Sequence, residues 1–169
     1  MELNFKQKLQ TISCFIFDVD GVLTDGSLVL FENGEQTRTM NIRDGYALQA
    51  AVKAGYKVAI ISGGRSESVK TRLNGLGVMD VYIGADNKKE KFDEVVSMYD
   101  LKPENILYMG DDLPDFEVMK ISGVPTCPAD AAREIKAISV YVSDKKGGDG
   151  CVRDVIEQVM MLHGKWKPQ

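Results

Sequence analysis

The sequence predicts an α/β fold: a Rossmann-like parallel sheet with helices on both faces and a protruding β-hairpin. Two observations predict it. Short apolar runs alternate with amphipathic stretches, and the longer runs are apolar throughout, as is typical of parallel strands buried on both faces. The chain has 169 residues, the length of one domain, and no repeat, low-complexity tract or Pro/Gly/Ser-rich linker divides it. We therefore expect a single domain over residues 1–169.

The predicted elements follow from this alternation. The apolar runs predicted to form strands are residues 14–18, 57–61, 81–83, 106–109 and 139–142. The amphipathic stretches predicted to form helices are residues 45–54, 66–76, 88–99, 115–120, 131–136 and 152–162. A strand–helix alternation of this kind indicates a parallel sheet covered on both faces.

One segment, residues 27–40, interrupts the alternation. Two short runs flank Asn33-Gly34, and an Asn-Gly pair is the strongest short-range signal for a β-hairpin. A lone two-stranded hairpin is marginally stable in water. Its apolar residues Leu28, Leu30 and Phe31 are therefore expected to pack against another surface, such as a second subunit.

Composition and charge exclude several classes of protein. Hydrophobic residues make up 44% and charged residues 27% of the chain, which is ordinary for a globular protein. The net charge of −4 argues against a surface for nucleic acid or anionic membrane. The cysteines, Cys14, Cys127 and Cys151, form no CxxC pair, so neither a disulfide framework nor a zinc site is indicated. No apolar stretch resembles a membrane span or a signal peptide, and we expect a cytoplasmic protein.

Polar residues gather where the predicted strands end. In open parallel sheets, ligands bind at the carboxyl ends of the strands. The segments found there are Asp18-Val19-Asp20-Gly21, Ser62-Gly63-Gly64-Arg65, Lys88 at a helix start, and Gly110-Asp111-Asp112-Leu113-Pro114-Asp115. Carboxylates, a hydroxyl, an ammonium group and backbone amides are thus expected at one edge of the sheet.

These residue types point to phosphoryl transfer. Three or more ionised carboxylates repel one another unless a cation lies between them, and an all-oxygen cluster selects Mg²⁺ over zinc. Ser62, the amides after it and Lys88 offer hydrogen-bond donors and positive charge that suit a phosphoryl group. The chain has no GxxxxGK[ST] loop, so hydrolysis of a phosphate ester is favoured over nucleotide use.

The order and spacing of these four segments resemble the four motifs of the haloacid dehalogenase superfamily of phosphatases along nearly the whole chain. The resemblance implies that Asp18 is the nucleophile and forms an aspartyl-phosphate. It implies that Asp20 protonates the leaving alcohol and then takes a proton from water. Mg²⁺ would be held by the Asp18 carboxylate, the Asp20 backbone carbonyl and Asp111.

The resemblance also implies roles for the other polar residues. Ser62, Gly63 and Lys88 would bind the transferring phosphoryl oxygens, and Lys88 would offset the charge of the nucleophile. Asp112 and Asp115 would orient Lys88 or the waters of the metal.

Members of this superfamily often carry a cap domain, for which this chain has no room. Only the hairpin and one predicted helix lie between Asp20 and Ser62, and one helix and one short strand lie between Ser62 and Lys88. The capless edge would be open to water unless a macromolecular substrate or neighbouring subunits close it. The apolar hairpin favours neighbouring subunits.

A closer resemblance is to the 3-deoxy-D-manno-octulosonate 8-phosphate (KDO 8-phosphate) phosphatases. It rests on the DGVLTDG start, the hairpin, Asn41-Ile42-Arg43-Asp44-Gly45 and Gly147-Gly148-Asp149-Gly150. The resemblance implies a homotetramer in which hairpins form a central barrel, and a sugar-phosphate substrate on the route to lipopolysaccharide. Arg43 and Arg65 are then candidates for contacts with the sugar or its carboxylate. Some members have a basic residue where this chain has Asp149, so no substrate role is assigned to that turn.

Two alternatives remain open. The first is a phosphatase of a nine-carbon 3-deoxy-keto sugar acid 9-phosphate, which the same subgroup includes. The second is a non-catalytic tetramerisation module, like the domain appended to some cytidylyltransferases. The presence of Asp18, Asp20, Lys88 and Asp111 argues against this second alternative.

Overall fold

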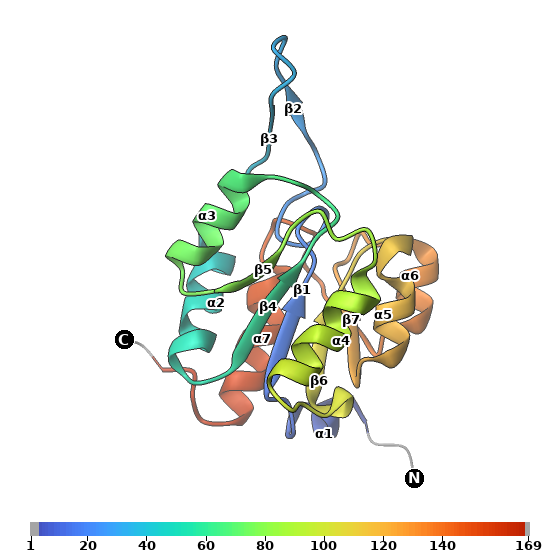
Figure 1. The fold of residues 1–169 in the computed structure, drawn as a ribbon. Coiled ribbons are helices and arrows are strands. Elements are labelled where there is room, and N and C mark those ends of the chain that lie inside the picture. Colours follow the sequence, from blue (N-terminus) through green and yellow to red (C-terminus); the bar gives the residue numbers. More distant parts are fainter. Residues whose placement is uncertain (1–3, 168–169) are drawn as a thin grey trace.

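The computed structural model describes residues 4–167 and confirms the α/β architecture (Figure 1). Six strands form one sheet in the order β5-β4-β1-β6-β7-β8, and every neighbouring pair is parallel. The strands of this sheet are β1 (Cys14–Phe17), β4 (Lys57–Ile61), β5 (Asp80–Tyr82), β6 (Ile106–Met109), β7 (Val124–Cys127) and β8 (Tyr141–Val142).

Helices cover both faces of the sheet and enclose one apolar core on each face. The helices whose buried residues form the first core are α1 (Phe5–Leu9), α2 (Ile42–Lys53), α3 (Glu67–Gly75) and α7 (Cys151–Leu162). Those of the second core are α4 (Lys88–Met98), α5 (Phe116–Ile121) and α6 (Arg133–Ile138). Two short 3-10 segments, Pro103–Asn105 and Leu113–Asp115, precede β6 and α5. Within residues 4–167, no helix has the length and apolar character needed to cross a membrane.

The central strand β1 sets the position of the predicted site. All four of its residues are buried, which explains why its sequence is apolar without alternation. In the sheet register, Phe17 lies beside Ile60 of β4 and Met109 of β6. The segments that follow these three strands therefore begin at the same edge of the sheet, where ligands bind in folds of this type.

Two elements were not predicted from the sequence, α1 and β7. Pro125 lies within β7, and proline in a sequence argues against a central strand because it has no N–H to donate. The structure explains how this proline is tolerated. Its carbonyl accepts from the Val140 amide on the side of β8, and β8 pairs with β7 only from Thr126 onward. The nitrogen of Pro125 thus faces a position before the start of β8, where no strand partner would accept a hydrogen bond from it.

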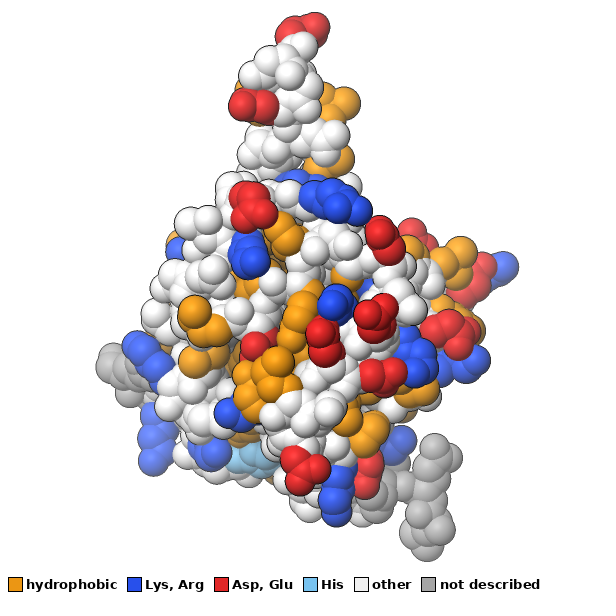
Figure 2. All heavy atoms as spheres, in the orientation of Figure 1, with side chains coloured by type: hydrophobic (Ala, Val, Ile, Leu, Met, Phe, Trp, Pro, Cys, Tyr) orange, Lys and Arg blue, Asp and Glu red, His pale blue; other side chains and the backbone are white. Residues whose placement is uncertain are grey.

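The hairpin predicted over residues 27–40 is present and projects away from the sheet (Figure 1). Its strands, β2 (Val29–Leu30) and β3 (Gln36–Thr37), pair antiparallel with each other and form a separate two-stranded sheet. Figure 2 shows hydrophobic side chains along the projecting hairpin. Leu30 is 70% and Phe31 52% exposed, so the hairpin's apolar side chains have not been buried by the rest of the chain.

Candidate active site

The predicted polar residues lie around one pocket of about 320 Å³ at the carboxyl ends of β1, β4 and β6. The pocket brings together residues that lie more than ninety positions apart in the sequence. Its lining includes each residue predicted for nucleophilic, acid–base, metal or phosphate contact: Asp18, Asp20, Ser62, Gly63, Lys88 and Asp111. It also includes Asp112 and Asp115, the two residues predicted to orient Lys88 or the waters of the metal.

Lys88 joins two buried carboxylates at the base of this pocket. It begins α4, and its Nζ lies 3.0 Å from Asp18 Oδ2 and 2.8 Å from Asp115 Oδ1. Burial of Lys88 would lower its pKa, but the charges and hydrogen bonds of the two aspartates outweigh burial and raise it. The same burial, together with the charge of Asp115, raises the pKa of Asp18 in spite of Lys88. A phosphoryl group entering this site therefore meets a fixed ammonium group beside the proposed nucleophile.

Asp115 accepts hydrogen bonds from three groups around the base of this pocket. Its Oδ1 accepts from Lys88 and also from the Tyr108 hydroxyl at 2.7 Å, and its Oδ2 accepts from the Asp111 amide at 3.2 Å. The contribution of Tyr108 was not foreseen. A tyrosine inside an otherwise apolar buried strand is itself a signal, because a buried hydroxyl needs a hydrogen-bond partner.

A group of carboxylates suited to a divalent cation lies in the same pocket. One oxygen from each of Asp18, Asp111 and Asp115 falls within 4.8 Å of the others. Burial and the nearby charges of Asp115 and Asp112 raise the pKa of Asp111 to about 7. Gly21 allows Asp111 to approach, since a Cβ at this position of φ +84° would lie 1.9 Å from Asp111 Oδ2. Crowded, dehydrated carboxylate oxygens fit Mg²⁺, whose charge would offset their repulsion.

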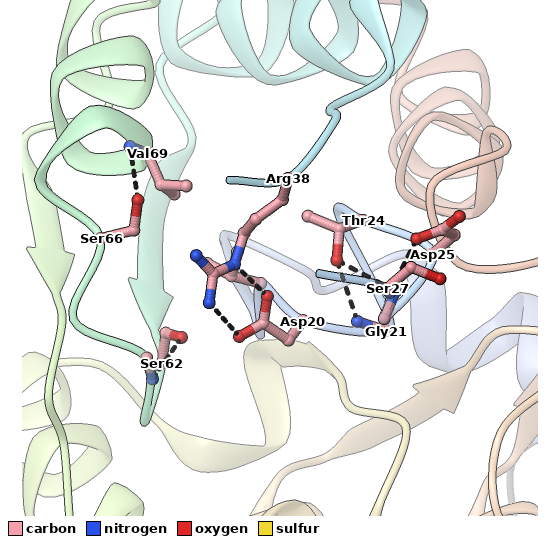
Figure 3. A network of polar contacts seen from close by, with 12 residues as sticks. Asp20, Gly21, Thr24, Asp25, Ser27, Arg38, Ser62, Ser66 and Val69 are labelled. Atoms are coloured by element: carbon pink, nitrogen blue, oxygen red, sulfur yellow. Dashed lines mark hydrogen bonds and ion pairs between the residues drawn. The ribbon is translucent and has the colours of Figure 1, made fainter. Parts of the chain in front are cut away.

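Asp20 is held by a residue that the sequence did not reveal, Arg38. Arg38 Nε donates to Asp20 Oδ1 at 2.6 Å and Nη2 donates to Oδ2 at 3.3 Å, as Figure 3 shows. Arg38 directly follows β3, so the base of the hairpin supplies it. The sequence shows that a basic residue lies at position 38, but no periodicity indicates which way a side chain of a hairpin points. The contact with Asp20 could therefore not be predicted.

Ser62 and Asp112 complete the lining of the pocket. Ser62 is buried, and its Oγ accepts from the Gly64 amide at 3.1 Å (Figure 3). Its own proton is therefore available to an acceptor in the pocket. Asp112 is exposed, and its Oδ1 accepts from the Leu113 amide at the start of the 3-10 turn. The structure thus gives Asp112 a local capping role at the edge of the pocket.

The glycine turn before α7 supports the loop that follows β1. The Gly148 amide donates to the Val22 carbonyl, and a Cβ on Gly147 would lie 2.0 Å from the Gly21 carbonyl oxygen. Only a residue without a side chain permits this close approach. The turn therefore packs against the backbone that carries Asp20.

Arg43 and Arg65, the candidates for sugar contacts, do not line the Asp18 pocket. Arg43 lines a separate groove with Arg153 and Asp149. Arg65 lines the cavity beside the hairpin and lies 3.5 Å from Asp86, with its side chain 74% exposed. Within one protomer neither arginine reaches the pocket, and a substrate role for either stays a prediction.

Comparisons with known proteins agree with this geometry. The profile of the haloacid dehalogenase-like hydrolase family (Hydrolase_3) matches residues 73–155. The 3-deoxy-D-manno-octulosonate 8-phosphate phosphatase KdsC of Salmonella typhi is 37% identical over 158 residues, which cover 94% of this chain and 84% of that protein. The KdsC protein of Yersinia pestis is 35% identical over 159 residues.

Solved structures show the same similarity. The crystal structure of the Yersinia pestis phosphatase has a TM-score of 0.92 at 34% identity, covering 95% of this chain and 86% of that chain. The phosphatase of Moraxella catarrhalis, solved in complex with a magnesium ion, a phosphate ion and KDO, has a TM-score of 0.89 at 32% identity. That match covers 93% of this chain and 90% of the other. The chain therefore belongs to the KDO 8-phosphate phosphatase family of haloacid dehalogenase-like hydrolases.

Proposed function

We propose that this protein is a Mg²⁺-dependent phosphatase that hydrolyses KDO 8-phosphate to KDO and phosphate, a step toward lipopolysaccharide. The observation that carries the proposal is the contact of Lys88 with Asp18 and Asp115 in a pocket that also holds Ser62 and Asp111. The relatives support KDO 8-phosphate as the substrate, because the Moraxella catarrhalis phosphatase was solved with KDO and phosphate.

The metal would be held by the Asp18 carboxylate, Asp111 and the backbone carbonyl of Asp20. Asp115 is close enough to join them, but both of its oxygens already accept hydrogen bonds from within the protein. When bound, Mg²⁺ would offset the negative charge of the phosphoryl oxygens and of the carboxylates.

The residues of the chain account for the remaining steps. Asp18 attacks phosphorus, the bond from phosphorus to the leaving oxygen breaks, and an aspartyl-phosphate forms. Asp20 gives its proton to the leaving oxygen and then takes one from the water that hydrolyses the aspartyl-phosphate. Lys88 and the Ser62 hydroxyl donate hydrogen bonds to the transferring phosphoryl oxygens, while Asp115 keeps Lys88 in place.

The active form is proposed to be a homotetramer in the cytoplasm. The exposed apolar side chains of the hairpin, among them Leu30 and Phe31, support assembly with further copies of the chain. Among residues 4–167, no cap domain lies over the pocket, so neighbouring copies would also close it. The three free cysteines, all buried, agree with a reducing compartment.

The test is phosphate release from a panel of sugar phosphates that includes the eight- and nine-carbon keto acids, with and without a chelator. A preference for KDO 8-phosphate that is lost on chelation and restored by Mg²⁺ is the expected result. If phosphate release depends on the metal but is fastest from a nine-carbon acid, the proposed chemistry stands and the proposed substrate is wrong. Release from none of the panel would favour a non-catalytic assembly module.

A further inference from the structure

The ion pair between Arg38 and Asp20 fixes both oxygens of the carboxylate. Two nitrogens of one guanidinium group face the two oxygens at 2.6 and 3.3 Å (Figure 3). A planar guanidinium group that meets a carboxylate in this way restricts its rotation as well as its position. A single donor would leave the carboxylate free to turn.

Burial distinguishes this pair from the ion pairs on the surface. The Arg38 side chain is 8% exposed and that of Asp20 37%. By contrast, the exposed pair of Lys89 and Asp93 on α4 has more than half of each side chain in solvent. Exposed pairs hold their partners weakly, whereas a nearly buried guanidinium group keeps a defined orientation. Among residues 4–167, Asp20 is the acidic partner of Arg38.

The side chain of Asp20 is held by fewer groups than that of Asp18. The Asp18 oxygens are held by the Val19 amide at 2.7 Å and by Lys88 at 3.0 Å. In the described part of the chain, the hydrogen bonds to the Asp20 carboxylate come from Arg38. Without Arg38, the half-exposed Asp20 side chain would be free to change rotamer.

Asp20 also lies between two neighbouring cavities. Asp20 lines the pocket that contains Asp18, and it lines the small adjoining cavity that contains Arg38. Arg38 thus holds Asp20 from the adjoining cavity and does not itself line the Asp18 pocket.

We propose that Arg38 is a positioning residue that holds Asp20 in the orientation required for proton transfer; this inference rests on the function proposed above. In this step Asp20 carries a proton on one oxygen while the other oxygen accepts from Arg38. As the bond from phosphorus to the leaving oxygen breaks, that proton moves to the leaving oxygen and the phosphoryl group moves to Asp18. Arg38 contacts neither the substrate nor the phosphoryl group. Since it follows β3, the hairpin contributes to the chemistry as well as to assembly.

The test compares substrates whose leaving groups do and do not need a proton. An alkyl phosphate must be protonated as it leaves, whereas p-nitrophenyl phosphate releases a stable phenolate. The variants are Arg38→Met and Arg38→Lys, with Arg133→Met as the control because the Arg133 side chain is 93% exposed. The rate of the first phosphoryl transfer is measured by rapid quench with p-nitrophenyl phosphate and with the alkyl phosphate that the wild type hydrolyses fastest.

For Arg38→Met we expect the alkyl phosphate rate to fall about 100-fold with KM nearly unchanged, as for a misplaced catalytic group. The nitrophenyl phosphate rate should fall less than about threefold, because this leaving group needs no acid. Arg38→Lys, which keeps the charge but not the two-nitrogen contact, should recover part of the alkyl phosphate rate. Arg133→Met should behave as the wild type.

Three results would overturn the proposal. An equal loss on both substrates would mean that Arg38 supports the site as a whole, and a raised KM with unchanged kcat would mean that it binds substrate. A wild-type rate in Arg38→Met would mean that Arg38 is not required. If Arg38→Met does not fold, the same comparison of substrates is made on Arg38→Lys. A wild type inactive on all phosphates would instead refute the proposed function.

Discussion

The buried end of the sheet and the projecting hairpin differ in how their side chains are held. At the sheet, Asp18, Lys88 and Asp115 are almost fully buried and fix one another through contacts of 2.8–3.0 Å. In the hairpin, the residues of both strands are exposed, and Leu30 and Phe31 face solvent. Asp18, Lys88 and Asp115 are thus positioned by the core of the protomer, while the apolar side chains of the hairpin are left exposed by it.

Asp20 connects the two regions. It follows the central strand directly, yet its carboxylate is held by Arg38 from the base of the hairpin. Of the two aspartates in the first motif, the buried one depends on the core and the half-exposed one on the hairpin. Changes at the sheet should therefore alter stability and metal binding, and changes at the hairpin tip should alter assembly.

The largest effect on stability is expected when the buried ammonium group of Lys88 is removed from the end of the sheet. Lys88→Met would leave Asp18 and Asp115 buried without a positive partner, which should lower the free energy of unfolding by about 3–5 kcal/mol. Urea denaturation measures it. The control on the same helix is Lys89→Met, which removes an exposed pair with Asp93 and should cost about 0.5 kcal/mol or less. Equal losses in the two variants would contradict the distinction between buried and exposed pairs.

A smaller effect is expected in how Mg²⁺ binding depends on pH. The pKa of Asp111, about 7 in the folded chain, lies above its ordinary 3.8. The metal-free protein therefore loses stability through this group as the pH rises from about 4 to about 7. Protons compete with the metal below pH 7, so Mg²⁺ affinity should rise about tenfold from pH 6 to pH 8, or about 1.4 kcal/mol.

Calorimetric titration of Mg²⁺ at the two pH values checks this expectation. Asp111→Asn should bind Mg²⁺ weakly, and its affinity should change less between pH 6 and pH 8 than that of the wild type, because Asp18, whose pKa is also raised, is then the carboxylate left to compete for protons. An affinity for the wild type that is equal at pH 6 and pH 8 would exclude Asp111 as the group that competes with protons for the metal.

The smallest effect on the protomer is expected at the hairpin. Replacing Leu28, Leu30 and Phe31 together by serine should yield monomers, because these side chains lie exposed in the protomer. The opening free energy of the sheet, measured by hydrogen exchange, should change by less than about 0.5 kcal/mol. Analytical ultracentrifugation measures the assembly. A serine variant, or a deletion of residues 27–40, that still sedimented as a tetramer would show that the hairpin is not the assembly element.

Much of the site could be predicted because parallel strands end at a common edge. Once residues 14–18, 57–61 and 106–109 were assigned as strands, the polar segments after them had to meet. The hairpin could be predicted from Asn33-Gly34, since that pair dictates the turn locally. Both predictions depend on short-range patterns with direct geometric consequences.

The remaining parts depend on contacts that local patterns do not encode. Arg38 reaches Asp20 across the hairpin, and the direction of an exposed hairpin is not set by periodicity. Strand β7 contains Pro125, which is tolerated only because β8 begins beyond it. Tyr108 lies in an apolar run of the sequence, which does not show that its hydroxyl donates to Asp115. The positions of Arg43 and Arg65 relative to the pocket could be determined only from the fold.

The central claim, that Asp18 carries the phosphoryl group, can be tested by trapping. Asp20→Asn, which lacks the group that activates water, is mixed with Mg²⁺ and p-nitrophenyl phosphate, quenched in acid and reduced with borohydride. Reduction converts an aspartyl-phosphate to homoserine, which mass spectrometry of the peptides locates. We predict homoserine at position 18, and none at that position when Asp18→Asn is added, a change that should also abolish turnover. Homoserine at another aspartate, or phosphate release by the Asp18→Asn variant, would contradict the assignment of the nucleophile.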